Sequence, residues 1–240
     1  MLKSLKTYVL AILILGVVSC DKKEANFTLK GSIKGLKKGT VYLQKDGDSS
    51  RITLDSMQIM GEPEFVLSTD LEEPILLFLK LAKNDNIDDN VIPFFADKGE
   101  MQIKTTLKRF SFDAKITGSQ QQEVLEDYLE IVEIYKDQNL DLIKHNFDAQ
   151  KRQDSVAVDS LNKRYERLTR LKYAATINFA LNHNDSEVAP YLAVYEIPNT
   201  SVKYMDSIYN NLTSEIKESH YGKILGDALR DYRTALDTLN

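Results

Sequence analysis

The 240-residue sequence has no tryptophan, one cysteine and three histidines. A disulfide needs two thiols and a CxxC redox site needs a second cysteine, so neither can be built within this chain. His145, His183 and His220 are far apart and lack the spacing of zinc ligands, so we expect no metal site. The HExxH, GxSxG and GxxxxGK[ST] motifs are absent, as is a GxGxxG that follows a strand. We therefore predict a protein that is not an enzyme, with no catalytic residues and no cofactor.

The single cysteine, Cys20, ends an apolar run near the N-terminus. Lys3 and Lys6 precede the apolar residues 8–18, and the small Ser19 follows them. This order is typical of a secretory signal. The apolar run is too short for a transmembrane helix, which needs about 20 residues. We therefore expect residues 1–19 to be a signal peptide, with an uncleaved signal anchor or an ordinary cleaved signal without a lipid as alternatives.

The residues VVSC, 17–20, resemble a bacterial lipobox. The resemblance implies that the sulfur of Cys20 receives a diacylglycerol, that cleavage occurs before it, and that the new amino group is acylated. Because each buried methylene contributes about 0.8 kcal/mol, several acyl chains on one residue give stable anchoring. We therefore expect a lipidated tether at residues 20–26 and a lipid bilayer as the partner of acylated Cys20.

The composition is acidic, with 31 basic and 36 acidic residues and a net charge of −5. Removal of residues 1–19 takes away Lys3 and Lys6, which leaves 29 basic residues and a net charge of −7. A chain this acidic is a poor general nucleic-acid binder, so we expect no nucleic-acid partner. The hydrophobic content of 42% is ample for a core.

Residues 27–118 have the alternation of β-strands. Apolar and polar residues alternate in short runs that turn signals such as GLKKG, DGDSS and DKGE separate. Seven or eight such strands predict an antiparallel sandwich or barrel. The runs are FTLKGSI, TVYLQK, RITLDSMQIM, EFVLST, ILLFLKLA, VIPFFA, MQIKTTL and FSFDAKITG.

Residues 119–240 have helical spacing instead. Ser119 and Gln122 form a capping box, which predicts a long helix to about Phe147. A second helix should begin near Asp154 or Asp159, end near residue 182, and form an antiparallel hairpin with the first. The whole chain is thus predicted to be α+β, with a β domain followed by a helical region.

Shorter helices should follow this hairpin. SEVAPYLAVYEI begins one that Asp185 or Ser186 would cap. Two more are expected at residues 202–212 and 221–236.

The two long helices carry opposite charges. Glu126, Glu130, Glu133, Asp137 and Asp141 form an acidic stripe on the first helix, whereas Lys163, Arg167 and Arg170 form a basic stripe on the second. One interpretation is a docking surface for a charged partner. The favoured interpretation is a solvated face with ion pairs between adjacent helices, each worth about 0–1 kcal/mol.

Two other groups of residues suggest ligand sites that we do not favour. NDNIDDN offers Asp85, Asp88 and Asp89 to a calcium ion, but it lacks the spacing of an EF-hand, so we interpret it as a solvated loop. Phenylalanines of the β half could line a ligand groove, but alternation places half of them in the core. These phenylalanines are Phe94, Phe95, Phe110 and Phe112.

The tripeptide pattern Asp-[Ser/Thr]-apolar occurs more often than average composition predicts. It resembles the acceptor of O-glycosylation on exported bacterial proteins, and we state glycosylation as a hypothesis. The structural alternative is that Asp and Ser cap helices and turns. The candidate acceptors are Ser56, Ser155, Ser160, Ser207 and Thr238.

Four stretches of the chain resemble the domain of unknown function 4369 (DUF4369), found on exported lipoproteins of certain Gram-negative bacteria. They are FTLKGSIKGLKKGTVYL, GEPEFVLSTDLEEPILLFLKL, FFADKGEMQI and ITGSQQQEVLEDYL. In that family the domain commonly precedes a thioredoxin-like module, and LNHNDSEVAPYLAVYEIP is similar to the helical linker between the two. A CxxC-bearing fold would begin after DYRTALDTLN, and no residue of this chain matches its catalytic cysteines.

Together these features predict a lipid-anchored accessory or binding module of the bacterial cell envelope, facing the periplasm at the inner or outer membrane, with a protein partner there. The alternative is an accessory subunit of a thiol-disulfide redox system whose cysteines lie on a separate thioredoxin-like protein.

Overall fold

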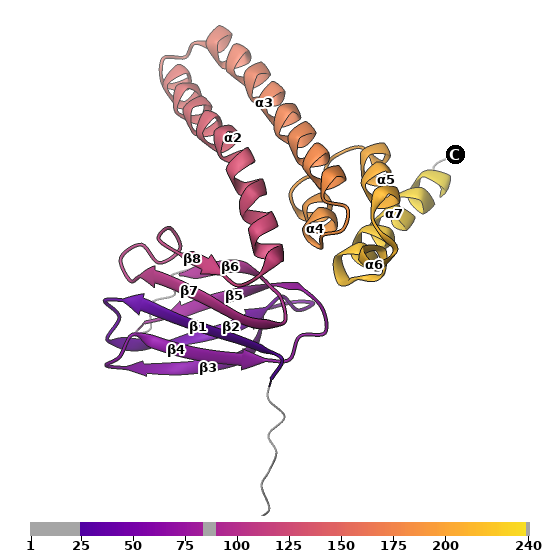
Figure 1. Cartoon of the computed structure of the whole chain (residues 1–240). Helices are drawn as coiled ribbons and strands as arrows, with labels where there is room; N and C mark the ends of the chain where they lie inside the picture. The colour runs from indigo at the N-terminus through magenta and orange to yellow at the C-terminus, as the bar shows by residue number, and fades with distance from the viewer. Residues whose placement is uncertain (1–24, 84–89, 239–240) are drawn as a thin grey trace, which may run out of the picture.

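The computed structural model describes residues 25–83 and 90–238. Two β-sheets form a sandwich, and a helical region lies against one of them (Figure 1). Every described strand precedes every described helix, which confirms the predicted α+β fold. The strands are β1 (Phe27–Lys34), β2 (Lys38–Lys45), β3 (Ile52–Met60), β4 (Glu64–Thr69), β5 (Ile75–Ala82), β6 (Val91–Ala96), β7 (Gly99–Thr106) and β8 (Lys115–Thr117).

The two sheets have four strands each, in the orders β4-β1-β7-β8 and β3-β2-β5-β6. One pair differs from the antiparallel prediction, because β1 and β7 run parallel, with Phe27 opposite Gly99 and Lys34 opposite Thr106. Between these strands the chain visits the other sheet twice, as β2 and β3 and then as β5 and β6, and it returns to the first sheet as β4 in between. The remaining strand pairs of the described residues are antiparallel.

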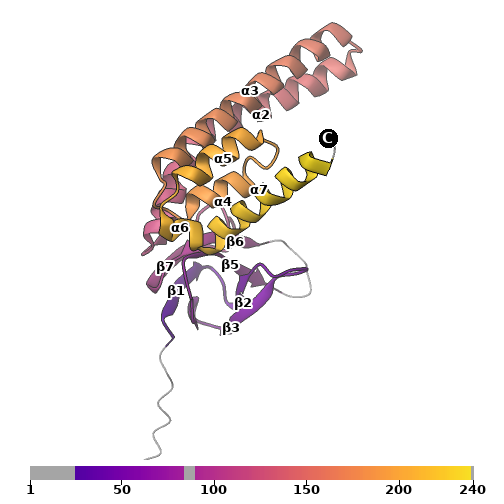
Figure 2. The ribbon, with the colours of Figure 1, turned by 90° about the vertical axis from the view of Figure 1, so that its right-hand side faces the viewer.

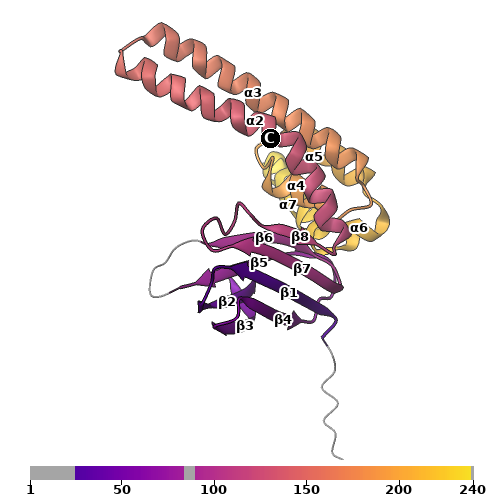
Figure 3. The same cartoon turned by 60° about the vertical axis from the view of Figure 1, so that its left-hand side comes forward.

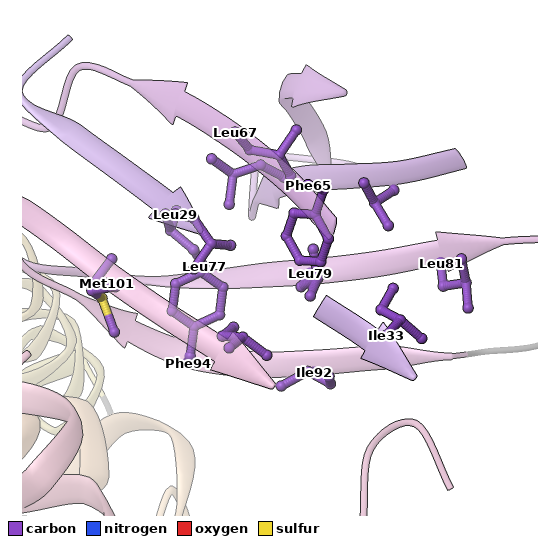
Figure 4. Packing of buried hydrophobic residues seen from close by; sticks show 14 of the residues in the cluster. Leu29, Ile33, Phe65, Leu67, Leu77, Leu79, Leu81, Ile92, Phe94 and Met101 are labelled. Atoms are coloured by element: carbon purple, nitrogen blue, oxygen red, sulfur yellow. The ribbon is translucent and has the colours of Figure 1, made fainter. Parts of the chain in front are cut away.

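The sandwich core lies between the sheets and follows from the alternation of the sequence (Figure 4). Leu29 and Ile33 of β1 face Leu77 and Leu79 of β5 across this core, and all four are fully buried. Phe65 lies in register with Gly31. A Cβ added to Gly31 would lie 2.2 Å from the Phe65 ring, so the ring occupies the space that the glycine leaves.

Strands β5 and β6 are buried on both faces, which explains their nearly continuous apolar sequences. Leu77, Leu79 and Leu81 point into the sandwich. Leu76 and Phe78 point the other way, where they pack with Phe95 beneath the helices. The helical region therefore covers the outer face of this sheet at β5 and β6.

The change from strands to helices occurs at Gly118 and Ser119. Gly118 has a φ of +101°, and a Cβ there would lie 2.4 Å from the carbonyl oxygen of Glu100, so glycine is required. The Ser119 hydroxyl then accepts a hydrogen bond from the Gln122 N–H at 3.0 Å, which caps the first long helix. The helices are α2 (Gln120–Lys151), α3 (Ser155–Asn182), α4 (Val188–Tyr195), α5 (Val202–Asn211), α6 (Ser214–Glu218) and α7 (His220–Thr238).

Several helix boundaries differ from the prediction. Helix α2 runs one turn beyond Phe147, because residues 148–151 are compatible with a helix and Ala149 continues its buried side. The start of α3 agrees with one of the two predicted positions, because Asp154 caps it and its carboxylate accepts from the Ala157 N–H. The N-cap position of α4 is occupied by Glu187, although the Ser186 hydroxyl accepts a hydrogen bond from the Val188 N–H nearby. Helix α6, only five residues long, has too little periodicity to be predicted.

The hairpin of α2 and α3 extends from the rest of the molecule as an arm, which we define as residues 133–171 (Figures 1 and 2). The shorter helices pack beside the other end of the hairpin and over the sandwich. The described chain begins on the side of the sandwich remote from the tip of the arm, in all three views (Figure 3). The arm therefore points away from the place where the chain enters the fold.

Candidate functional site

The shorter helices α4 and α7, which lie beside the base of the arm, pack on the sandwich. Phe95 of β6 contacts the rings of Tyr191 and Tyr221, with centroids 5.4 and 5.6 Å apart. The Tyr221 hydroxyl accepts a hydrogen bond from the Leu76 N–H at 3.1 Å. Burial raises the pKa of Tyr221 and raises that of Tyr191 to about 12, so both phenols stay neutral. These contacts join α4 and α7 to strands β5 and β6.

A seam of residues at alternating spacings of four and three joins α2 to α3. This spacing is typical of coiled coils. The α2 side of the seam includes two asparagines, and the Asn146 amide donates to the Asn162 carbonyl oxygen on α3 at 3.2 Å. The other, Asn139, has a buried carbonyl oxygen without a hydrogen-bond partner. The seam residues of α2 are Tyr128, Val132, Tyr135, Asn139, Leu142, Asn146 and Ala149.

The arm is thinly packed, because two helices alone cannot cover both sides of their own seam. Within residues 133–151 of α2 only Leu142 and Ala149 are buried, and α3 has no buried residue before Leu168. Large apolar side chains are left exposed on the arm. Clusters of this kind on a soluble protein indicate interaction surfaces.

One side of the arm is an apolar face formed by Leu140, Ile143, Phe147, Leu161 and Tyr165. Ile143, Phe147, Leu161 and Tyr165 line a shallow groove of about 320 Å³. Phe147 is 58% exposed and Leu140 64%. Lys151 places its ammonium group 4.3 Å from the centre of the Phe147 ring. This arrangement can bind an apolar segment of a partner protein.

The other side of the arm is a charged groove of about 410 Å³. Asp141 and His145 come from α2, and Arg164 and Arg167 come from α3. No ion pair or side-chain hydrogen bond among the described residues involves Asp141, Arg164 or Arg167. The remaining lining residues are Gln138, Leu142, Leu168 and Leu171.

The prediction of ion pairs between α2 and α3 is therefore wrong. Within residues 25–83 and 90–238, no ion pair joins α2 to α3. Two basic residues of the stripe pair within α3, Lys163 with Asp159 at 2.7 Å and Arg170 with Glu166 at 3.8 Å. Asp141 and Arg167 line the two edges of the charged groove without forming an ion pair, and the other residues of the two stripes are exposed.

A third hollow, of about 730 Å³, lies where the helices meet the strand ends, and its lining is mostly acidic. Glu187 is only 4% exposed and accepts a hydrogen bond from the Ser219 hydroxyl at 2.6 Å. Burial, aided by the nearby Glu73, Glu215 and Asp97 carboxylates and opposed by the Ser219 hydrogen bond, raises the pKa of Glu187 to about 7. Near neutral pH this carboxyl is therefore partly protonated.

The histidines and the phenylalanines are not brought together as sites. His183 stacks on Phe179 with centroids 3.9 Å apart, whereas His145 lies on the arm. The phenylalanine groove is not formed, because Phe94 and Phe110 lie in the sandwich core, Phe95 lies beneath the helices, and Phe112 is 85% exposed. In the part of the chain that the structure describes, no group of three or more acidic, histidine or cysteine side chains could hold a metal ion.

The anchor and the acidic loop fall outside the described residues. Cys20 lies in residues 1–24, and Asp85, Asp88 and Asp89 lie in residues 84–89. No helix within the described ranges is long and apolar enough to span a membrane.

The candidate glycosylation sites remain predictions. Ser56, Ser155, Ser160 and Ser207 are exposed. The preceding aspartates also have structural roles, since Asp154 caps α3, Asp159 pairs with Lys163, and Asp206 pairs with Arg233. Thr238 is the last residue of α7, and its side chain lies outside the described set.

The apolar face was not recognised in the sequence, although a signal for it exists. Leu140, Ile143 and Phe147 are separated by three and four residues, as on one side of a helix, but they are offset from the seam residues. Two apolar sets on one helix indicate either a larger bundle or a binding surface. The structure shows that no further helix covers this part of α2 in the described chain.

Comparison with known families matches residues 27–125 to a family described as a domain of unknown function (DUF4369). The match covers the described strands and the first residues of α2. No curated protein matches the chain.

Proposed function

We propose that this protein, whose residues 27–125 form a DUF4369 domain, is a lipid-anchored accessory module of the bacterial cell envelope that binds a protein partner through its arm. In this proposal acylated Cys20 attaches the chain to a bilayer and the folded part faces the periplasm. The protein performs no chemistry of its own. It acts by holding a partner at a set distance from the membrane.

The direction of the arm carries this proposal. The described chain begins on the side of the sandwich remote from the arm tip, so an anchor that precedes residue 25 leaves the arm pointing away from the bilayer. Helix α2 has 32 residues and is therefore about 48 Å long at about 1.5 Å per residue. A partner in the periplasm could reach the apolar face without approaching the lipid.

The chemistry of the apolar face supports a protein partner. Exposed Leu140, Ile143 and Phe147 give area for apolar contact, and the aromatic residues Phe147 and Tyr165 are types enriched at interfaces. The Lys151 ammonium group beside Phe147 adds a polar rim. The groove is open and shallow, which suits a side chain or helix of a partner better than a small molecule.

Cross-linking in living cells tests this proposal. A photo-reactive amino acid replaces Ile143 in one strain and Val66, which is 53% exposed on the sandwich, in another. We expect the first strain to capture one identifiable envelope protein, and the change Phe147→Glu in that strain to abolish the capture. Equal capture from both positions, or capture that survives Phe147→Glu, would contradict the proposal.

The redox alternative stays a prediction, because neither the family match nor a described residue bears on thiol exchange. An assay in which the purified chain is added to a CxxC-containing thioredoxin-like protein distinguishes this redox alternative from the binding role. A higher rate of disulfide exchange on addition would favour that alternative over a purely binding role.

A further inference from the structure

The charged groove, on the side of the arm opposite the apolar face, has opposite charges on its two edges. Its α2 edge carries Asp141, and its α3 edge carries Arg164 and Arg167. None of the three has an ion-pair partner among the described residues. A second copy related by a twofold axis can place its basic edge against this acidic edge and its acidic edge against this basic edge.

The charged residues also lie at matching levels along the arm. Counted from the turn at residues 152–154 with a rise of about 1.5 Å per residue, Asp141 is about 17 Å along α2. On the same scale Arg164 is about 15 Å and Arg167 about 20 Å along α3. Asp141 of one arm would therefore stand between the two arginines of an arm that points the same way.

We propose that a second copy of this chain occupies the charged groove, related by a twofold axis parallel to the arm. This axis lays α2 of one copy over α3 of the other. Asp141 of each copy then meets Arg164 and Arg167 of the other copy. The four helices then form a parallel arrangement of two hairpins. An axis perpendicular to the arm would instead lay α2 over α2 and bring the acidic stripes together.

Apolar residues on the same side of the arm fit this arrangement. Ile134 is spaced by seven from Asp141 and lies on the same flank of α2, while Leu171 lines the groove from α3. They are 57% and 47% exposed. Both lie about 26–27 Å from the turn by the same rise, so Ile134 of one copy would cover Leu171 of the other.

A second copy explains the groove better than an unrelated peptide. An acidic or a basic peptide would satisfy one edge and be repelled by the other, whereas the same surface turned by the twofold axis satisfies both. Parallel arms also place the beginnings of both described chains on the same side. The dimer leaves both apolar faces free, so it goes beyond the proposed function and does not require the anchor.

A charge-swap experiment on the full chain in detergent tests the dimer. Two variants, Asp141→Arg and Arg167→Glu, are studied separately and then mixed, with sedimentation velocity as the measurement. Each variant alone places like charges together in the homodimer, which should weaken association at least about tenfold. The mixture should regain part of the dimer, because Asp141 of the second variant then meets both arginines of the first, while the introduced arginine of the first variant meets the introduced glutamate and Arg164 of the second.

Arg170→Glu is the matched control for Arg167→Glu. It makes the same change of charge at a residue that does not line the groove. We expect it to dimerise like the unchanged chain, and high salt to weaken the dimer of the unchanged chain. A chain that stays monomeric at all concentrations, or a mixture that stays monomeric, would overturn the inference. Cross-linking from Ile143 to an envelope protein would still succeed in that case, so the two proposals fail separately.

Discussion

The side-chain oxygen of Gln122 accepts a hydrogen bond from the backbone N–H of Phe95 at 2.8 Å. Phe95 lies on β6, the last strand of its sheet, so this N–H has no neighbouring strand to pair with. One side chain in the first turn of α2 thus satisfies the strand edge and fixes the helix to the sandwich. The predicted capping box is therefore only half formed, since the Gln122 side-chain oxygen accepts from the strand and its amide nitrogen donates to Glu126 one turn along the helix.

Replacing Gln122 should loosen the base of the arm. Gln122→Met keeps the length of the side chain but leaves the buried Phe95 N–H without an acceptor, which should cost about 1–3 kcal/mol. Urea unfolding followed by circular dichroism measures the loss. Gln120→Met is the control, because Gln120 is exposed and should change stability by less than about 0.5 kcal/mol.

The contact between Gly31 and Phe65 predicts a coupled pair of substitutions. Gly31→Ala should destabilise the sandwich by about 1–3 kcal/mol, because its Cβ overlaps the Phe65 ring. Phe65→Leu removes the ring and should reduce the further cost of Gly31→Ala. A double-mutant cycle in urea measures the coupling energy, and additive effects of the two substitutions would contradict the contact.

Glu187 predicts a loss of stability as pH rises. The pKa of its carboxyl is raised to about 7 in the folded protein, above its ordinary value of 4.5. The folded state therefore keeps a proton that the unfolded state releases, so stability is full below pH 4.5 and falls as pH rises to about 7. Between those values we expect this group alone to cost about 1–3 kcal/mol.

Glu187→Gln should remove most of this pH dependence, since an amide stays neutral and can still accept from the Ser219 hydroxyl. The melting temperature of the variant, measured between pH 5 and 8, should fall less than that of the unchanged chain. Glu133→Gln, on the exposed surface of α2, is the control and should leave the profile unchanged. Parallel profiles for Glu187→Gln and the unchanged chain would show that Glu187 is ionised at all these pH values.

The glycosylation hypothesis predicts a mass above that of the polypeptide and its lipid. Ser155 and Ser160 lie exposed near the start of α3, where a glycan would not disturb packing. Intact mass spectrometry of protein from its own cells should show the added mass, and Ser155→Ala with Ser160→Ala should reduce it. Protein without any glycan would leave capping by Asp154 and pairing by Asp159 as sufficient reasons for the pattern.

The sequence predicted the fold class because the relevant signals are local. Alternation along FTLKGSI and EFVLST marks the strands, and Gly118 with Ser119 marks the change to helices. The parallel pairing of β1 with β7 was not predicted, because it depends on contacts between residues about 70 positions apart. No short segment carries that information.

The candidate site was predicted less well, for a related reason. The charge stripes and the apolar residues of α2 are visible in the sequence, but whether a third helix covers them depends on tertiary packing. The structure leaves Phe147 and Ile143 exposed, and Asp141 and Arg167 have no ion-pair partner within the described part of the chain. Glu187 shows the same limit, since its burial comes from the loop at Ser219, far along the chain.

The claim on which the account rests is that Cys20 attaches this folded body to a bilayer with its arm directed outward. Mass spectrometry of the N-terminal peptide, taken from protein purified from its own cells, tests it most directly. We predict a peptide that begins at Cys20 and carries a diacylglycerol and an amide-linked fatty acid. A peptide that begins at another residue, or that has a free thiol at Cys20, would contradict the account.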